Sequence, residues 1–185
     1  MGKHLLVLLS LFWVLSPQPA SATIMVALDL SQLADRADQV LLATVEKTES
    51  HWTASHDSIF TDVTMRVQKV YKGVTSPGSV VVVRREGGSV DGIALKVFGS
   101  PEFRAGEEAV VFAQRRSGND WVVGMSQGKL RVVADASGRR MVRPPDLSGV
   151  SFLPGQKAAP APTTRALEEF EQDLAGVLSS SRPQK

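Results

Sequence analysis

Side chains alternate between two faces along the segment from Ile59 to Gln68. A period of two residues is typical of a β-strand with one buried face and one solvated face. Such a strand has to be paired and its apolar face covered, which favours a β-sandwich or a small barrel. The alternation slips at residues 69–71, and we expect a β-bulge there. One face would carry Ile59, Thr61, Val63, Met65 and Val67, and the other Phe60, Asp62, Thr64, Arg66 and Gln68.

Further short apolar segments follow at a spacing of roughly 8–12 residues, separated by glycine-containing turns. We expect the valine-rich strand that begins at Ser79 to be buried on both faces. Turns are predicted at Asp91-Gly92, in the segment 117–120 and in the segment 135–138. The predicted strands cover residues 40–45, 59–67, 79–83, 93–98, 109–113, 121–125, 130–134 and 141–143.

Two amphipathic helices are predicted, one before the strands in the chain and one after them. The first lies within residues 23–38 and is capped by Asp29 or Ser31. The second begins after Thr164, beyond a Pro- and Ala-rich stretch at 154–163 that reads as a linker. Its apolar stripe either packs back on the strands or binds a partner protein, since both uses need the same spacing. The stripe consists of Leu167, Phe170, Leu174 and Val177 or Leu178.

The N-terminus has the order of a secretory signal peptide. A positive start is followed by eleven apolar residues at 5–15, a Pro-x-Pro break, and Ala20-Ser21-Ala22. Eleven residues are too few for a membrane span, which needs about 20. We expect cleavage after Ala22, export by the general secretion route, a periplasmic or extracellular location, and no transmembrane anchor after cleavage.

Composition excludes several classes of protein. The chain has no cysteine, which rules out thiolate zinc sites, thiol redox chemistry and cysteine nucleophiles. Lysine and arginine number 21 against 19 acidic residues, and signal cleavage removes only Lys3 of these. So balanced a charge does not favour nucleic acid as a partner.

No catalytic or metal-binding set is evident. The segment 124–128 (GMSQG) matches the nucleophile elbow of hydrolases, but a strand rather than a helix is predicted after it, and no histidine follows His56. His51, His56 and Asp57 share one loop without a known metal spacing. Glu107 and Glu108 are adjacent, so on a strand they point to opposite faces. We therefore expect no enzyme activity, no cofactor and no metal.

Basic residues cluster late in the strand region, where only Asp135 opposes them between residues 129 and 143. If the strands bring these side chains together, one face could hold an anionic polymer such as a cell-surface glycan. The alternative is an ordinary solvated strand face. The possible anionic-ligand surface consists of Lys129, Arg131, Arg139, Arg140 and Arg143.

Three segments together resemble a known barrel. An apolar strand follows Ala34-Asp35 or Ala37-Asp38, the strand from Ile59 runs into residues 70–73 (VYKG), and residues 103–108 (FRAGEE) precede another apolar strand. This pattern resembles netrin-like modules and tissue metalloproteinase inhibitors. It is also similar to uncharacterised bacterial exported proteins with a Gln127-Gly128-Lys129 segment and a trailing helix. The resemblance covers residues 34–133.

The resemblance implies a closed five-stranded barrel. Those inhibitors bind the protease metal through an N-terminal cysteine, which this chain does not have, so protease inhibition is only an analogy here. We expect a mainly β protein with a small closed barrel like that of the oligonucleotide/oligosaccharide-binding (OB) fold and the two helices. An immunoglobulin-like sandwich is the alternative.

The sequence thus predicts an exported, non-catalytic binding or accessory module that acts on a protein partner in the envelope or outside the cell. A glycan-binding barrel and a protease-inhibitor-like protein are the alternatives. The predicted organisation is a signal peptide at 1–22, a barrel domain with its lead-in helix at 23–143, a linker at 144–163, and an amphipathic helix with a disordered end at 164–185.

Overall fold

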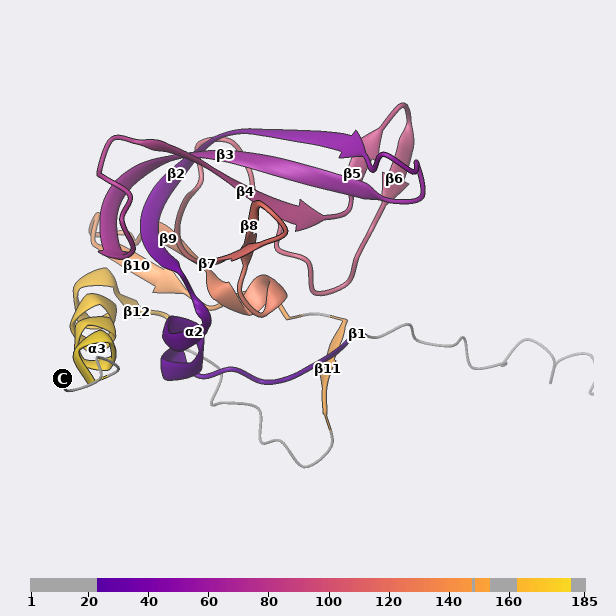
Figure 1. Cartoon of the computed structure of the whole chain (residues 1–185). Helices are drawn as coiled ribbons and strands as arrows, with labels where there is room; N and C mark the ends of the chain where they lie inside the picture. The colour runs from indigo at the N-terminus through magenta and orange to yellow at the C-terminus, as the bar shows by residue number, and fades with distance from the viewer. Residues whose placement is uncertain (1–22, 148, 154–162, 181–185) are drawn as a thin grey trace, which may run out of the picture.

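The computed structural model describes residues 23–147, 149–153 and 163–180 (Figure 1). The predicted signal peptide, most of the Pro- and Ala-rich stretch and the predicted disordered end lie outside the described residues. The described part is mainly β, as the sequence predicts. No helix in it is both long and apolar enough to cross a membrane.

Five strands form the centre of the sheet: β2 (Gln39–Trp52), β3 (Ile59–Lys72), β4 (Val80–Glu86), β7 (Glu108–Arg116) and β8 (Asn119–Val122). Strand β2 lies between β3 and β7, and β4 lies on the other side of β3, all in antiparallel pairs. Strand β8 pairs antiparallel with β7 and, over two residues, parallel with β4. The pairings therefore run from β7 through β2, β3, β4 and β8 back to β7, and Figure 1 shows the strands strongly curved.

Shorter elements extend this centre. Strands β9 (Lys129–Ala134), β10 (Arg140–Arg143) and β12 (Arg165–Ala166) continue the sheet outward from β7. A hairpin of β5 (Gly88–Val90) and β6 (Ile93–Leu95) follows β4. Strand β1 (Thr23–Met25) pairs in parallel with β11 (Val150–Phe152), and a 3₁₀ turn, η2 (Met125–Gly128), leads into β9.

The predicted alternation in β3 is confirmed. Every second side chain from Ile59 to Val67 is buried, and the intervening ones are partly or fully exposed. The register with β2 shifts twice near the end of β3, where Gln68 and Tyr71 have no direct partner. These irregularities confirm the predicted bulge, and they allow the long strand to bend around the core.

The apolar run at the start of β2 is explained by two covered faces. Val40 and Leu42 pack in a core beneath the helices, together with Phe112 of β7. Ala43 and Val45 pack in a second core enclosed by the curved strands, with Val63, Met65 and Val83 among its members. A strand covered on both sides reads as continuously apolar rather than alternating.

The expectation that the valine-rich strand β4 is buried on both faces is wrong. Val83 is buried, but Val80 is 49% and Val82 is 47% exposed. These two side chains point away from the enclosed core, and the helices pack elsewhere, against β7, β9 and β10. An apolar run cannot by itself tell whether a second layer exists to cover it.

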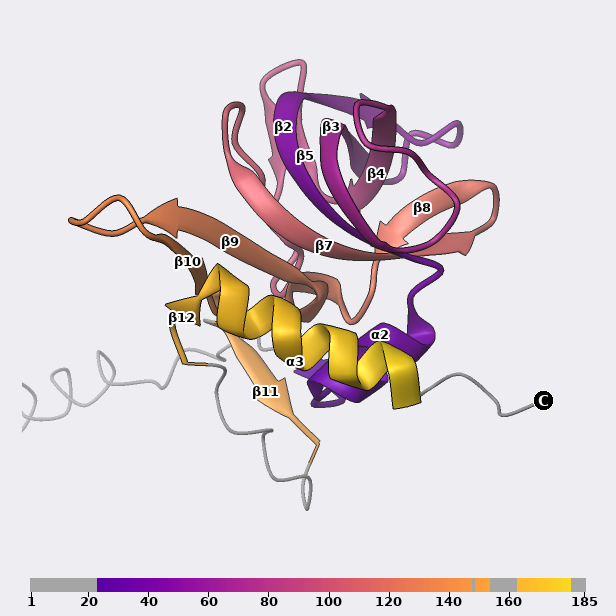
Figure 2. The same cartoon turned by 90° about the vertical axis from the view of Figure 1, so that its left-hand side faces the viewer.

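Helix α2 (Leu30–Arg36) begins where predicted, because Asp29 and Gln32 form a capping box. Helix α3 (Leu167–Ser180) lies beside α2 and across the strands (Figure 2). Its stripe of Leu167, Phe170 and Leu174 is buried in the same core as α2, and Leu178 is partly buried against it. The apolar stripe is therefore used inside the molecule, and those three side chains are not free to bind a partner.

Two short strands, β11 and β12, lie where the sequence predicts a linker and the start of the last helix. Strand β11 lies inside residues 144–163, and β12 precedes α3, which begins at Leu167 rather than directly after Thr164. Arg165 and Ala166 are extended because they pair with Val142 and Met141 of β10. Such short pairings leave little pattern in a sequence.

Candidate functional site

A cavity of about 620 Å³ lies among the β5–β6 hairpin, the segment 96–107, the start of β9, residues 144–146 and Gly149. We call it the basic cavity. Its acidic lining residues are Glu102, Glu107 and Asp146. Its basic lining residues are more numerous: Arg85, Lys96, Arg104, Lys129 and Arg131. Positive charge in a recess with protein walls favours an anionic ligand.

Arg85 reaches this cavity from the inner side of β4. It lies opposite buried Thr61 and in phase with buried Val83, whereas Arg84 points outward opposite Asp62. One guanidinium nitrogen, Nη1, donates to the Glu86 carbonyl at 3.1 Å. The Nε atom is buried and has no hydrogen-bond partner among the described residues. Burial lowers the pKa of Arg85, and the nearby charge of Glu102 acts in the opposite direction.

Ser126 contributes a second buried polar group. The residue is only 4% exposed, and its amide donates to the Gly99 carbonyl at 2.8 Å. Its Oγ has no hydrogen-bond partner in the described part of the chain. The adjacent Ser100 hydroxyl donates to the Glu86 carbonyl at 2.6 Å, so segment 99–100 joins the surroundings of Ser126 to those of Arg85. Buried groups without partners are rare in native proteins and indicate a missing ligand or water.

The segment around Ser126 has a structural reason for its residues. Gln127 accepts from the Leu28 amide at 2.8 Å and donates to the Val26 carbonyl at 3.0 Å, which ties the N-terminal segment to the sheet. A Cβ at Gly128 would lie 2.4 Å from the Val123 carbonyl oxygen. The turn η2 leads into strand β9, and no helix follows it. The strand-to-helix turn that a nucleophile elbow requires is therefore not formed by residues 124–128.

Lys129 and Arg131 reach the basic cavity, but their charges are partly used. Lys129 Nζ lies 2.6 Å and Arg131 Nε 3.1 Å from Glu107 Oε1. The Lys129 and Glu107 side chains are only 8% and 7% exposed, so this ion pair is almost fully desolvated. Burial lowers the pKa of Lys129, and its bond to Glu107 acts against that shift. The Lys129 ammonium also lies 4.7 Å from the centre of the Phe103 ring.

Of the other members of the predicted anionic-ligand surface, Arg143 lies directly opposite Arg131 in the β9–β10 pairing, whereas Arg139 and Arg140 pair with acidic residues elsewhere. Arg139 pairs with Glu168 and Glu169 at 3.9 and 3.2 Å, so it holds the start of α3 to the sheet. Arg140 Nε donates to Glu108 at 3.2 Å. Arg143 is exposed and is not among the cavity residues. Acidic residues distant in the sequence therefore pair with four of these five cations, and a common anionic-ligand surface stays a prediction.

Sequence reasoning missed the residues that complete the cavity: Arg85, Lys96 and Arg104. A signal for Arg85 did exist, because it follows Val83 at the strand period and so shares its inward direction. Lys96 and Arg104 are exposed residues of a long loop between β6 and β7, and no local pattern marks where such a loop packs.

A second group of basic residues lies next to aromatic rings, although the basic and the aromatic residues come from different parts of the sequence. Phe60 and Trp121 meet edge to face at 5.3 Å. The Arg84 guanidinium lies 5.8 Å from the Phe60 ring, and that of Arg116 lies 5.7 Å from the Trp121 ring. We call these four residues the arginine–aromatic surface. Hydrogen bonds from Arg84 to Asp62, at 2.7 and 2.9 Å, lower the pKa of that carboxyl.

A hollow of about 250 Å³ is lined by Arg84, Arg116 and Trp121 of this surface, together with Arg36 of α2. It shares Arg85, Ser100 and Pro101 with the basic cavity. The two hollows are therefore neighbours, and Arg85 contributes to both.

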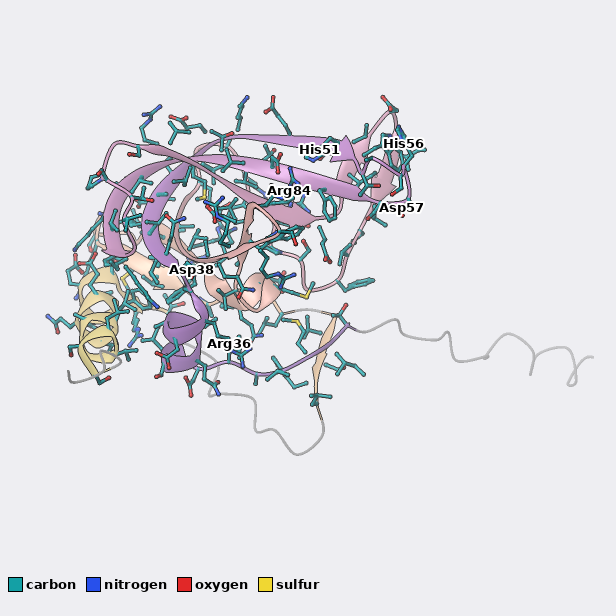
Figure 3. The ribbon with its side chains drawn as sticks, in the orientation of Figure 1. Arg36, Asp38, His51, His56, Asp57 and Arg84 are labelled. Carbon is teal, nitrogen blue, oxygen red and sulfur yellow. The ribbon has the colours of Figure 1, made fainter. Side chains whose placement is uncertain are left out.

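His56 and Asp57 lie in the β2–β3 connection, but His51 lies on strand β2, paired with Phe60 of β3, so the prediction that all three share one loop is wrong (Figure 3). His56 stacks on Trp52 with ring centres 6.0 Å apart, and Asp57 accepts from Thr53 at 2.7 Å. His51 Nε2 lies 3.9 Å from Asp62. Among the described residues no group of three or more His, Cys, Asp or Glu side chains is arranged to hold a metal ion.

The fold and this site define a small, mainly β protein with a basic cavity next to an arginine–aromatic surface. Neither a protein-family model nor a curated protein matches the chain. The functional argument therefore depends on the cavity itself.

Proposed function

We propose that the protein is an exported, non-catalytic binding module that holds an anionic group in the basic cavity. The observation that carries this proposal is Arg85, whose buried Nε has no partner among the described residues. Desolvating part of a guanidinium without a hydrogen bond is costly, and a bound carboxylate, sulfate or phosphate would remove that cost. The unpaired Ser126 hydroxyl offers the same anion a second donor.

The scaffold that we propose is a closed barrel like that of the OB fold. The order of pairing supports it, since β7, β2, β3, β4 and β8 form a circuit closed by the parallel contact between β4 and β8. A five-stranded Greek-key barrel has this kind of closure. The resemblance to netrin-like modules leads to the same barrel. Export by the general secretion route, to the periplasm or the outside of the cell, remains part of the proposal.

A small anionic ligand is a better-supported partner than a protein bound by α3. The predicted partner surface was the apolar stripe of that helix, and its main members are buried against α2 and the sheet. Exposing them to a partner would require undocking the helix from its own core.

The test is a sulfate titration of the protein purified after secretion, with thermal denaturation as the readout. Sulfate should raise the melting temperature, because a ligand that binds only the folded state stabilises it. In Arg85→Met this increase should shrink to the general stabilisation that sulfate gives to any folded protein. In the control Arg66→Met, an exposed arginine of β3 that does not line the cavity, it should persist in full. Equal increases in all three proteins, or no increase in any, would overturn the proposal.

The arginine–aromatic surface favours a second candidate, binding of an anionic glycan. Sugar rings stack on aromatic faces, and arginines recognise carboxylate and sulfate groups. Retention on immobilised sulfated polysaccharide should then fall in Trp121→Ala and in Arg116→Ala. The double variant Arg139→Ala/Arg140→Ala should be retained like the wild type, since both side chains already pair with acidic residues. The reverse pattern would return the glycan site to the 129–143 stretch.

A further inference from the structure

One wall of the basic cavity is apolar. Leu95, Val97, Phe98 and Pro101 line it from one side, and Pro144-Pro145 line it from another. Leu95 and Phe98 remain 37% and 36% exposed, so part of each side chain is in contact with solvent. The charged lining and this apolar wall therefore face the same space.

Exposed apolar side chains continue around the rim. Ile93 precedes Leu95 on the same face of β6, and β1 runs past the wall, where Thr23 Oγ1 donates to the Phe98 carbonyl at 2.8 Å. Three of the large apolar residues that are exposed in the described part of the chain belong to β6 and the segment after it: Ile93, Leu95 and Phe98. Exposed apolar side chains beside a cavity favour a ligand with an apolar part.

The wall is held in place by close packing behind it. A Cβ at Gly149 would lie 2.6 Å from Cδ1 of Phe98, so the ring rests directly on the backbone there. A Cβ at Gly99 would lie 3.0 Å from Met25 Sδ and 3.2 Å from Val150 Cγ2. The β1–β11 pair thus supports the wall from outside, and the exposed apolar surface is built into the fold.

We infer that the ligand of the basic cavity is an amphiphilic anion: a carboxylate, sulfate or phosphate head on an alkyl or aryl body. This inference rests on the proposed function. The head is bound by Arg85 and Ser126, and the body lies against Leu95, Phe98 and the prolines. A volume of about 620 Å³ is within the usual range for pockets that enclose small organic ligands.

The simpler ligands each leave half of the cavity unused. An inorganic anion would satisfy the cations and leave the apolar wall in water. A neutral apolar molecule would cover the wall and leave Arg85 Nε and Ser126 Oγ buried without partners. Only a ligand with both parts removes both costs, which are the cost of exposed apolar surface and that of unpaired buried donors.

The experiment compares inorganic sulfate, hexyl sulfate, octyl sulfate and uncharged octanol by isothermal titration calorimetry on the secreted protein. Octyl sulfate should bind at least about 100-fold more tightly than sulfate, since each buried methylene adds a factor of about three to four. Octanol should bind much more weakly than octyl sulfate. Near-ultraviolet circular dichroism of every variant confirms that it is folded before its binding is compared.

Three variants separate the two parts of the ligand. Phe98→Asn should weaken octyl sulfate at least about tenfold and leave sulfate unchanged, whereas Arg85→Met should weaken both. Val74→Asn is the control, because Val74 is fully exposed and does not line the cavity.

The outcomes distinguish this inference from the proposed function. If sulfate binds in an Arg85-dependent way and octyl sulfate binds no more tightly, the inference of an amphiphilic ligand is wrong, and the proposed anion site is retained. If octanol equals octyl sulfate, the cavity is simply apolar and the inference fails. If no anion binds through Arg85, the proposed function itself fails. Binding to vesicles of anionic phospholipid without any binding of octyl sulfate would assign the apolar rim to a lipid surface and overturn the inference.

Discussion

Docking of α3 can be tested by one pair of substitutions on the same helix. Leu174 is 0% exposed and lies in the core with Leu33, Phe112 and Phe170, whereas Leu178, one turn further along, is only partly buried against that core. Replacing either by alanine changes the helix propensity equally, so the difference between the two variants reports burial alone.

The expected magnitudes follow from the two environments. Leu174→Ala removes a fully enclosed side chain and leaves a cavity, which typically costs 2–5 kcal/mol, and about 3 kcal/mol is expected here. Leu178→Ala should cost about 1 kcal/mol, because part of its surface is already in water. For a chain of this size, 3 kcal/mol corresponds to a decrease in melting temperature of roughly 6–12 °C.

The assay is urea denaturation followed by the fluorescence of Trp52 and Trp121, with thermal denaturation as a second measure. The urea midpoint should shift strongly for Leu174→Ala and weakly for Leu178→Ala, with an unchanged slope. Equal and small losses, both below about 1 kcal/mol, would refute the docked helix. Such a result would return the apolar stripe to the role of a partner-binding surface.

Three further predictions concern the ion pairs and one glycine. Glu107→Gln should cost about 3 kcal/mol in urea denaturation, because buried Lys129 loses its counter-charge, while Glu49→Gln in an exposed pair should cost under about 0.5 kcal/mol. Gly88→Ala should lower the melting temperature far more than Gly92→Ala, although both glycines have positive φ. A Cβ at Gly88 would lie 2.3 Å from Ser50 Oγ, whereas a Cβ at Gly92 would have no atom within 4 Å. Burial raises the pKa of Glu171, but hydrogen bonds from Lys69 and Tyr71 outweigh it and leave the pKa below 4.5. Its stabilisation is therefore complete above that pH and is lost as pH falls through the lowered pKa. Urea midpoints at pH 6 and pH 3 should differ more for the wild type than for Glu171→Gln, and equal differences would remove Glu171 from the acid response.

The strands and turns of this protein are largely readable from the sequence, because the information is local. The alternation of β3, its bulge near Tyr71 and the capping box of Asp29 and Gln32 each depend on residues close together in the chain. The turn at Asp91-Gly92 has φ values of 52° and 78°, which glycine favours and aspartate tolerates. The alternation, the bulge and the turn were predicted from residue type and spacing alone, whereas the helix cap was predicted only as Asp29 or Ser31 and the part played by Gln32 was not predicted.

The site was less predictable, since its residues come from distant segments. Lys129 and Arg131 were singled out as cations available to a ligand, yet both lie within ion-pair distance of Glu107. Arg85 was not predicted as a site residue, although the chain fold turns it inward so that it lines the same cavity as Ser126 and the apolar wall. Charge counted along a sequence does not show which charges neutralise one another in space.

The sequence by itself thus determined the β-rich class, the two amphipathic helices and most turns, since backbone preference and hydrophobic period are properties of neighbouring residues. Tertiary structure alone decided that α3 packs on its own core, that β1 pairs with β11, and that β12 adds to β10. It also decided which arginines keep a free donor. The physical reason is that long-range strand pairing, burial and ion pairing depend on which distant segments meet, and short strands of two or three residues carry too little pattern to specify their partners.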